Sequence, residues 1–347
     1  MPVSPSSSRV AVVLFGIWLA TQFNSSASAV TDIKPAVAVV AETEAAGAPL
    51  QDAERQQLTD DVIDPISSDE TTADYASYFA FEGSSISNGT NGDATAPCKS
   101  FPGDSDWPPD IVWDIFDHLL GRALIPTKPL GAPCYDSKWG AKDEIECANI
   151  ISNTTNSEFL SADPTANFWP IFQGRTCQTK NVTSESQCTI GGYPEYAVNV
   201  TNVAQVQLAI NFARNANLRL VIKNTGHCYL GKSLGAGALS LWMHSLKDID
   251  FLLDYTGPGY SGPALKLAAG VSVREVYEAA ERHEVTVLGA VSPVSLVSHV
   301  SRSRPHTDNV TERGICWRHD HWRGSEPSCW NLRHGRRPRR RLPGRDC

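Results

Sequence analysis

The sequence lacks any apolar run long enough to cross a membrane. Its longest, Val10–Ala20, has 11 residues, whereas a transmembrane helix needs about 20. Arg9 precedes this run, and Ala27 and Ala29 follow it at the spacing of a secretory cleavage site. Residues 1–29 therefore predict a signal peptide, with no membrane anchor left after cleavage. We expect a secreted, extracellular protein.

Positive charge is scarce over the chain as a whole. The 347 residues include 30 Lys and Arg against 38 Asp and Glu, for a net charge of −8. This balance excludes a general nucleic-acid binder. Metal-ligand spacing is missing as well, because no C-x₂-C or H-x₃-H pair occurs in the region expected to be ordered. We therefore expect neither a nucleic-acid partner nor a metal ion.

Residues 30–95 contain few aromatic side chains and almost no basic ones. They hold 13 acidic and 2 basic residues, and no apolar period persists along them. A chain of this composition buries too little apolar surface to offset its conformational entropy. We predict a disordered acidic leader over this range.

Residues 96–190 are rich in loops and cysteines, after a helix predicted near Ile111–Leu119. An oxidising compartment lets cysteines pair, so we expect a disulfide-containing, loop-rich amino-terminal segment. Its five cysteines are an odd number, so one is left over or pairs with Cys228, and the spacing leaves the connectivity open. They are Cys98, Cys134, Cys147, Cys177 and Cys188. Glycosylation triplets at Asn88, Asn153, Asn181 and Asn199 fit the same compartment.

Strand and helix patterns alternate over residues 191–298, which predicts a mixed α/β unit (α+β class) of ordinary domain size. Asn202 is expected to cap a helix with an apolar stripe at Val203, Val206, Ile210 and Ala213. A capping box, Ser272 with Glu275, begins a second helix that places Val273, Val276, Tyr277 and Ala280 inward. Strands are expected at 196–200, 218–222, 239–243, 249–253, 265–268 and 285–288.

Residues 299–347 lack lysine, alanine, phenylalanine, tyrosine, glutamine and methionine, yet hold 12 arginines. One interpretation is a basic tail for nucleic acid or an anionic surface. The other is an aberrant, unstructured tail produced by mis-splicing or a frame shift. We favour the second, because a secreted protein has no ready nucleic-acid partner.

The stretch VIKNTGHCYLGKSLGAG, residues 221–237, places His227 and four glycines between two apolar runs. Glycines let backbone N–H groups approach an anion closely, which favours a phosphate-binding loop. A metal site is a weaker hypothesis, because His227 and Cys228 are adjacent and cannot easily point to one ion. An ordinary turn with a structural histidine fits too. A neutral imidazole is also a nucleophile, so His227 is a candidate for covalent attachment of a flavin.

The residue identities of this stretch indicate more than the spacing of its glycines does, because they resemble those of a known family. LRLVIKNTGHCYLGKSLGAGALSLWMHSLKDIDFL resembles the FAD-binding PCMH-type domain of the vanillyl-alcohol-oxidase/berberine-bridge-enzyme superfamily, in its secreted fungal branch. CKSFPGDSDWP, CTIGGYPEYAVNVTNVAQVQLAINFAR and GPALKLAAGVSVREVYEAAERHEVTVLGA are similar to other parts of the same branch. The resemblance covers residues 98 to about 290 and implies a split FAD domain, here carboxy-terminally incomplete.

The resemblance implies an FAD-linked oxidase that passes a hydride from a small organic substrate to flavin, with O₂ as electron acceptor. It places the FAD pyrophosphate at Lys223–Cys228 and aligns His227 with the family's flavin-linking histidine. The residues expected to contact FAD are Lys223, Asn224, Thr225, Gly226, His227 and Cys228, with Tyr229, Leu230, Gly231, Ser233 and Gly237 as second choices. No catalytic acid or base is assigned, since the family's candidates lie in the part that is missing here.

Two departures from the family pattern matter. Cys228 replaces the aspartate that usually follows the histidine, and Ser292 stands near the place of a second flavin-linking cysteine. Serine is a poor substitute for a thiolate, so we predict no second attachment. A second hypothesis is that the chain is a non-enzymatic secreted fragment, or a mis-spliced product, that cannot hold FAD.

Overall fold

The computed structural model describes residues 33–39, 48–81, 98–169, 171, 174–183, 185–257 and 260–289. The predicted signal peptide, the arginine-rich tail, Asn88 and Ser292 lie outside these residues. Within them, no helix is both long and apolar enough to span a bilayer. Nor do His, Cys, Asp and Glu gather in the described part as a group that could hold a metal.

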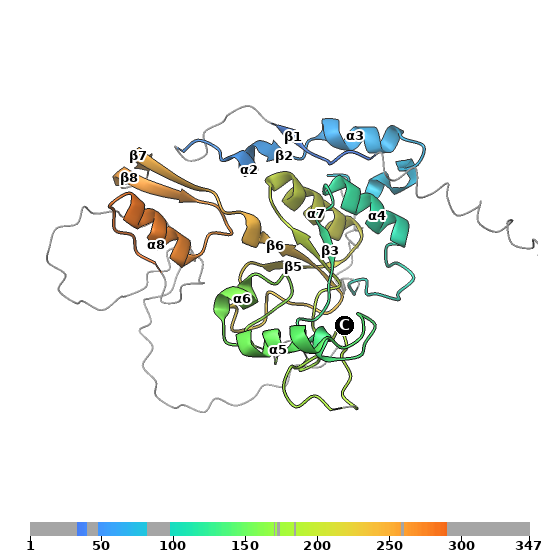
Figure 1. Cartoon of the computed structure of the whole chain (residues 1–347). Coiled ribbons are helices and arrows are strands. Elements are labelled where there is room, and N and C mark those ends of the chain that lie inside the picture. The colour runs from blue at the N-terminus through green and yellow to red at the C-terminus, as the bar shows by residue number, and fades with distance from the viewer. Residues whose placement is uncertain are drawn as a thin grey trace, which may run out of the picture.

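A four-stranded sheet forms the centre of the structure, in the order β3-β4-β6-β5 (Figure 1). Strands β4 (Tyr196–Asn199), β6 (Ala238–Trp242) and β5 (Arg219–Lys223) are parallel, and β3 (Leu124–Pro126) is antiparallel to β4. Strand β6 lies in the middle and is almost wholly buried, as its run of small and apolar residues favours. The mixed α/β class and the strands expected at 196–200, 218–222 and 239–243 are confirmed, and the structure adds that these strands are parallel.

Helix α7 (Val203–Asn215) connects β4 to β5. The Asn202 side chain accepts a hydrogen bond from the Gln205 backbone N–H, as expected of a cap. The expected apolar stripe is confirmed at Ala213 and Val206 and wrong at Ile210, which is 43% exposed. The buried residues of the helix are Ala204, Leu208, Ala209, Asn211, Phe212 and Ala213. The helix is covered on two sides, so its buried face is wider than the stripe.

Beyond β6 comes a hairpin, β7 (Ile249–Gly257) with β8 (Tyr260–Leu267), followed by α8 (Val273–Arg282). The capping box at Ser272 and Glu275 is present. Two expectations are wrong here. Tyr277 is 45% exposed, and Ala279 takes the inward position. No strand forms at 285–288, where only Val285 makes an isolated bridge. A short apolar run did not distinguish a strand from a packed loop.

The expected disordered leader is wrong over 48–81. This segment folds into α2 (Asp52–Arg55), β2 (Gln56–Gln57, paired with β1, Ala38–Val39), α3 (Asp60–Ser68) and the 3₁₀ helix η1 (Ala73–Tyr78). Its apolar residues join the core shared by α7 and α4 (Asp110–Leu119). Figure 1 shows α3 above α7 and α4. The sparse apolar residues are sufficient because α7 supplies the rest of the core.

Hydrogen bonds from α7 also hold this segment. Arg214 donates to the carbonyls of Ala80 and Phe81 at 3.0 and 2.5 Å, and Asn211 donates to the carbonyl of Phe79 at 3.3 Å. The polar residues of α7 therefore satisfy backbone carbonyls that a segment without long regular elements leaves unpaired.

The cysteine-containing segment has more helix than expected. Besides α4 it contains the 3₁₀ helix η2 (Ala132–Cys134), α5 (Glu144–Asn153) and α6 (Ser157–Ser161). Disulfides join Cys134 to Cys147 and Cys177 to Cys188. Cys98 is also disulfide-bonded, whereas Cys228 is free. Figure 1 shows α5 and α6 across the sheet from α4 and α7.

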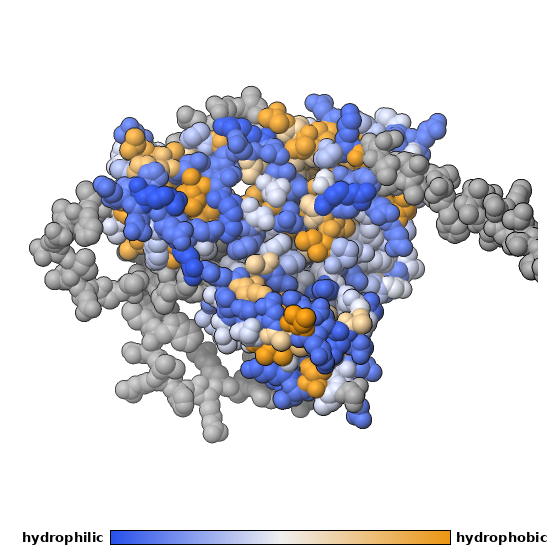
Figure 2. Space-filling model, viewed as in Figure 1, coloured by the Kyte–Doolittle hydropathy of each residue, from blue (hydrophilic) through white to orange (hydrophobic). Residues whose placement is uncertain are grey.

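The surface on the viewed face is mostly hydrophilic, with small separate apolar patches (Figure 2). The exposed apolar side chains of α5 are Ile145, which is 85% exposed, and Ile151, which is 42% exposed. Scattered apolar side chains of this kind are normal on soluble proteins.

Replacement of Phe79 tests the packing of the leader. Phe79 is fully buried, and its ring stacks on Phe212 at 5.7 Å and on Phe116 at 6.4 Å between ring centroids. We expect Phe79→Ala to lower the free energy of unfolding by about 3–5 kcal/mol, since it opens a cavity in the core. Guanidinium unfolding measures this. Val39→Ala is the control, because Val39 is 78% exposed; equal effects of the two variants would contradict the fold of 48–81.

Candidate functional site

The candidate site lies where the parallel strands end. Strand β5 ends at Lys223, and the loop 224–237 leads into β6. The carboxyl ends of β4 and β6 bring Asn199 and Trp242 to the same edge. In open α/β sheets, ligands bind outside this edge. The sheet therefore places the glycine-rich loop, which the sequence predicts to bind a ligand, at the edge where such sheets bind their ligands.

Lys223 anchors the loop from below. Its side chain is fully buried, and the ammonium donates to the backbone carbonyls of Asp163 at 2.7 Å and Asn224 at 3.2 Å. The Trp242 ring lies 5.6 Å from the ammonium. Burial lowers the pKa of Lys223 to about 8, and the Asp163 carboxylate acts in the opposite direction. Lys223 thus places a buried cation beneath the loop.

Asn224 fixes the first residue of the loop. Its side-chain N–H donates to the Ala269 carbonyl, its side-chain oxygen lies 3.1 Å from His244 Nδ1, and its backbone carbonyl accepts from the Trp242 indole at 3.2 Å. Burial, then Lys247 and Lys223, lower the pKa of His244 to about 4. His244 is therefore neutral at neutral pH and acts as a fixed polar partner of Asn224.

A second segment, residues 163–169, lies against the loop. Asp163 Oδ1 accepts from the backbone N–H groups of Thr165 and Ala166, both at 2.7 Å, which turns the chain back on itself. The Phe168 N–H then donates to the Gly226 carbonyl at 3.2 Å. Gly226 has φ +82°, and a Cβ there would lie 2.4 Å from the Ala166 carbonyl oxygen. Only glycine permits this close approach.

Aromatic rings surround His227, which is partly exposed. The rings of Phe168 and Tyr229 lie 5.1 and 5.3 Å from the imidazole, centroid to centroid. Tyr229 is 66% exposed and stacks on Trp169 at 5.1 Å. The free thiol of Cys228 is also partly exposed. The arrangement leaves one accessible nitrogen base beside flat apolar faces.

The backbone of this loop is rich in donors without partners. From Thr225 to Leu230, no backbone N–H finds an acceptor among the described residues. Successive N–H groups of this kind form anion-binding concavities. Together with Lys223 beneath them, they fit a phosphate or pyrophosphate group.

The second-choice residues lie further along and have structural partners. The Gly231 N–H donates to the Cys228 carbonyl at 3.2 Å, and the buried Ser233 hydroxyl accepts from Asn167 at 3.2 Å. Gly237 has φ +64°, and a Cβ there would meet the Phe101 ring at 2.4 Å. Leu230 is 69% exposed. The structure therefore gathers Lys223–Tyr229 at the site and gives Gly231, Ser233 and Gly237 roles in the shape of the loop.

Sequence reasoning missed the segment 163–169, Trp242 and His244. The Asp-x-Thr pattern at Asp163 carries a turn signal, but nothing in it indicates which distant loop it contacts. Trp242 and His244 become visible as site residues only once β5 and β6 are known to be parallel neighbours.

Comparison with known proteins agrees with this geometry. Residues 194–306 match the family model for an FAD binding domain. A VAO-type flavoprotein oxidase of Thermothelomyces thermophilus is 38% identical over 241 residues, 69% of this chain and 42% of that protein. The FAD-linked oxidoreductase patO of Penicillium expansum is 39% identical over 192 residues, 55% of this chain and 33% of that protein.

A solved structure agrees as well. The crystal structure of a VAO-type flavoprotein from Myceliophthora thermophila C1 superposes with a TM-score of 0.55 at 40% identity, covering 57% of this chain and 36% of that one. The matches define the class of protein that the chain resembles: residues 194–306 are similar to an FAD-binding domain. Its homologues are the fungal VAO-type FAD-linked oxidoreductases, of whose length it spans well under half.

Gly226→Ala tests the contact between the loop and residues 163–169. Positive φ strains any alanine, and at Gly226 the new Cβ also collides with the Ala166 carbonyl. We expect this variant to lose about 1–3 kcal/mol more unfolding free energy than Gly103→Ala. Gly103 is a matched control, since its φ is +100° but a Cβ there meets nothing within 4 Å. Equal losses in urea unfolding would show that the contact is absent.

His244 makes stability depend on pH. Its pKa is about 4 in the folded chain against 6.5 unfolded, so the unfolded state binds more protons between these values. The contribution is fully present above about pH 6.5 and is lost as pH falls towards 4. Discounted for partial exposure, it amounts to about 1–2 kcal/mol.

We therefore expect the unfolding free energy of the wild type to fall more steeply than that of His244→Gln between pH 6.5 and 4. Denaturant melts at several pH values measure both slopes. The two proteins share every other titrating group, so parallel slopes would refute the lowered pKa.

Proposed function

We propose that the chain is an FAD-dependent oxidoreductase of the oxidase type, with FAD attached covalently through His227. The observation that carries the proposal is the run of unpartnered N–H groups at Thr225–Leu230, above the buried cation of Lys223 and beside an accessible imidazole. The FAD-binding domain of the homologues supports it.

Each group has a role in holding the cofactor. The backbone N–H groups of Thr225–Leu230 bind the pyrophosphate. Lys223 adds positive electrostatic potential but does not contact the pyrophosphate, because its ammonium donates hydrogen bonds to two backbone carbonyls. Asn224 and His244 keep the loop in position. Phe168 and Tyr229 flank His227 and orient a flat ring beside it.

Bound flavin would supply the redox chemistry: it would accept a hydride from a small organic substrate and pass the electrons to O₂. In the proposed attachment, a ring nitrogen of His227 would bond to the 8α carbon of the flavin. The methyl group and the imidazole would each lose a proton, and the electron pair would pass to the flavin ring and from there to O₂. Cys228, in the place of the family's aspartate, is a free and partly exposed thiol. We assign no residue to substrate recognition or to the role of catalytic base.

We also propose that the protein is secreted and glycosylated. Two described disulfides fit an oxidising compartment. Asn181 is exposed with φ +58°, in a loop open to a glycan. Asn199 is a poorer acceptor, because it lies in β4 and its side chain accepts from Ser245 at 2.6 Å. No membrane or nucleic-acid partner is proposed.

A second candidate function is a non-enzymatic secreted fragment. The observation that favours it is coverage: the chain spans 42% of one relative and 33% of another. In that case the unpartnered N–H groups stay solvated and no flavin is held.

Colour distinguishes the two. We expect the full chain, expressed in a secretory host, to be yellow, with flavin that stays with the protein after acid precipitation. His227→Ala should release all flavin into the acid supernatant, because the attaching nitrogen is gone. Cys228→Ser is the matched control and should keep the bound flavin. Absorbance at flavin wavelengths in pellet and supernatant gives the readout, and a colourless wild-type protein would support the fragment.

A further inference from the structure

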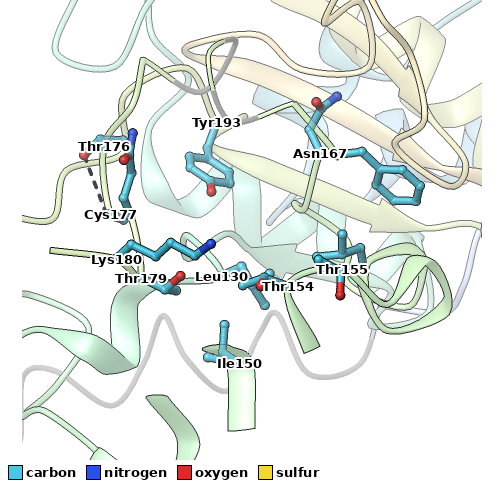
Figure 3. Close-up of a pocket in the computed structure, with 14 residues that line it drawn as sticks. Leu130, Ile150, Thr154, Thr155, Asn167, Thr176, Cys177, Thr179, Lys180 and Tyr193 are labelled. Atoms are coloured by element: carbon cyan, nitrogen blue, oxygen red, sulfur yellow. Dashed lines mark hydrogen bonds between the residues drawn. The ribbon is translucent and has the colours of Figure 1, made fainter. Parts of the chain in front are cut away.

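A separate cavity lies in the disulfide-tied segment, outside the glycine-rich loop. Its volume is 280 Å³, and its walls come from the two residues before η2, the carboxyl end of α5, Leu160 of α6 and the irregular stretch Thr176–Lys180, together with Asn167, Phe168 and Tyr193 (Figure 3). No lining residue belongs to 223–237. Phe168 borders both regions, since its other neighbour is the His227 ring.

The lining has a distinct chemistry. Leu130, Ile150, Leu160 and Phe168 supply apolar walls, and no aspartate or glutamate is among the lining residues. The one charged side chain there is Lys180. Such a cavity disfavours cations and favours an apolar body that carries one negative group.

Two polar groups converge in this space. Figure 3 shows the Lys180 ammonium and the Tyr193 hydroxyl directed towards the same region, above Leu130 and Ile150. Within the described residues, the Lys180 ammonium makes no hydrogen bond or ion pair. Tyr193 is 2% exposed, and burial raises its pKa, so its hydroxyl stays neutral.

The volume of the cavity limits the size of the ligand that it can hold. A dry cavity of about 150 Å³ accommodates benzene, and the volume here, 280 Å³, leaves room for one ring and a small substituent. We propose that this cavity binds a small aromatic carboxylate, with the ring against Ile150 and Phe168 and the carboxylate facing Lys180 and Tyr193. The cavity shares Phe168 with the surroundings of His227, and none of its lining residues belongs to the glycine-rich loop.

Calorimetric titration of the secreted full chain with benzoate tests the proposal. We expect binding with Kd below about 1 mM, and at least about tenfold weaker binding of benzamide, which lacks the charge, and of acetate, which lacks the ring. Lys180→Gln should weaken benzoate about tenfold and leave benzamide nearly unchanged. Lys142→Gln is the matched control, since Lys142 is another exposed lysine of the same segment and pairs with Glu144 outside the cavity.

The failing outcomes are distinct. No benzoate binding at about 10 mM, or equal affinity in wild type and Lys180→Gln, overturns the proposal. His227→Ala should bind benzoate as the wild type does, and a loss there would place benzoate at the flavin loop and overturn it too. If the chain is colourless but still binds benzoate through Lys180, the proposed flavin attachment is refuted and the proposed benzoate site is supported.

Discussion

The buried ammonium of Lys223 is the interaction on which the site depends. An ion taken from water into a protein interior is unfavourable unless hydrogen bonds replace its hydration. Here the carbonyls of Asp163 and Asn224 do so. The contact with the Asp163 carbonyl binds residues 163–169 to the start of the loop, so the desolvated charge determines how two segments 60 residues apart meet. Any rearrangement that separated them would leave the cation without the Asp163 carbonyl.

The position of residues 163–169 then shapes the rest of the loop. Phe168 takes the Gly226 carbonyl as its acceptor, and the chain passes so close that only a glycine fits. The Gly226 carbonyl is engaged on that side, whereas the N–H groups of Thr225–Leu230 have no acceptor among the described residues. A cation below and free donors above make the local potential positive, which is why an anion fits and why a second cation would not.

Much of the sheet was predictable from the sequence, because β4, β5 and β6 show local apolar runs and α7 and α8 carry their own caps. The loop 223–229 was predictable as well, since its glycines and its histidine lie in one stretch. Residues 163–169 were not, because their role rests on contacts across 60 residues. The prediction of a disordered leader was wrong over residues 48–81 for a related reason. Ile63, Ile66 and Phe79 are too few to form a core alone, and composition says nothing of the apolar surface that α7 and α4 offer them.

The elements outside the sheet also limit how far β5 is exposed. Strand β5 is at the edge of the sheet, and unpaired edges invite aggregation. The Ser100 N–H donates to the Asn217 carbonyl at 3.1 Å, Ser100 bridges Leu218, and the Phe101 ring fills the space beside Gly237. These contacts cover the amino end of the strand. Its carboxyl end leads into the loop, and among the described residues Ile222 is 62% exposed there. Cover at the amino end and exposure at the carboxyl end keep the donors of the proposed FAD loop within reach of a ligand.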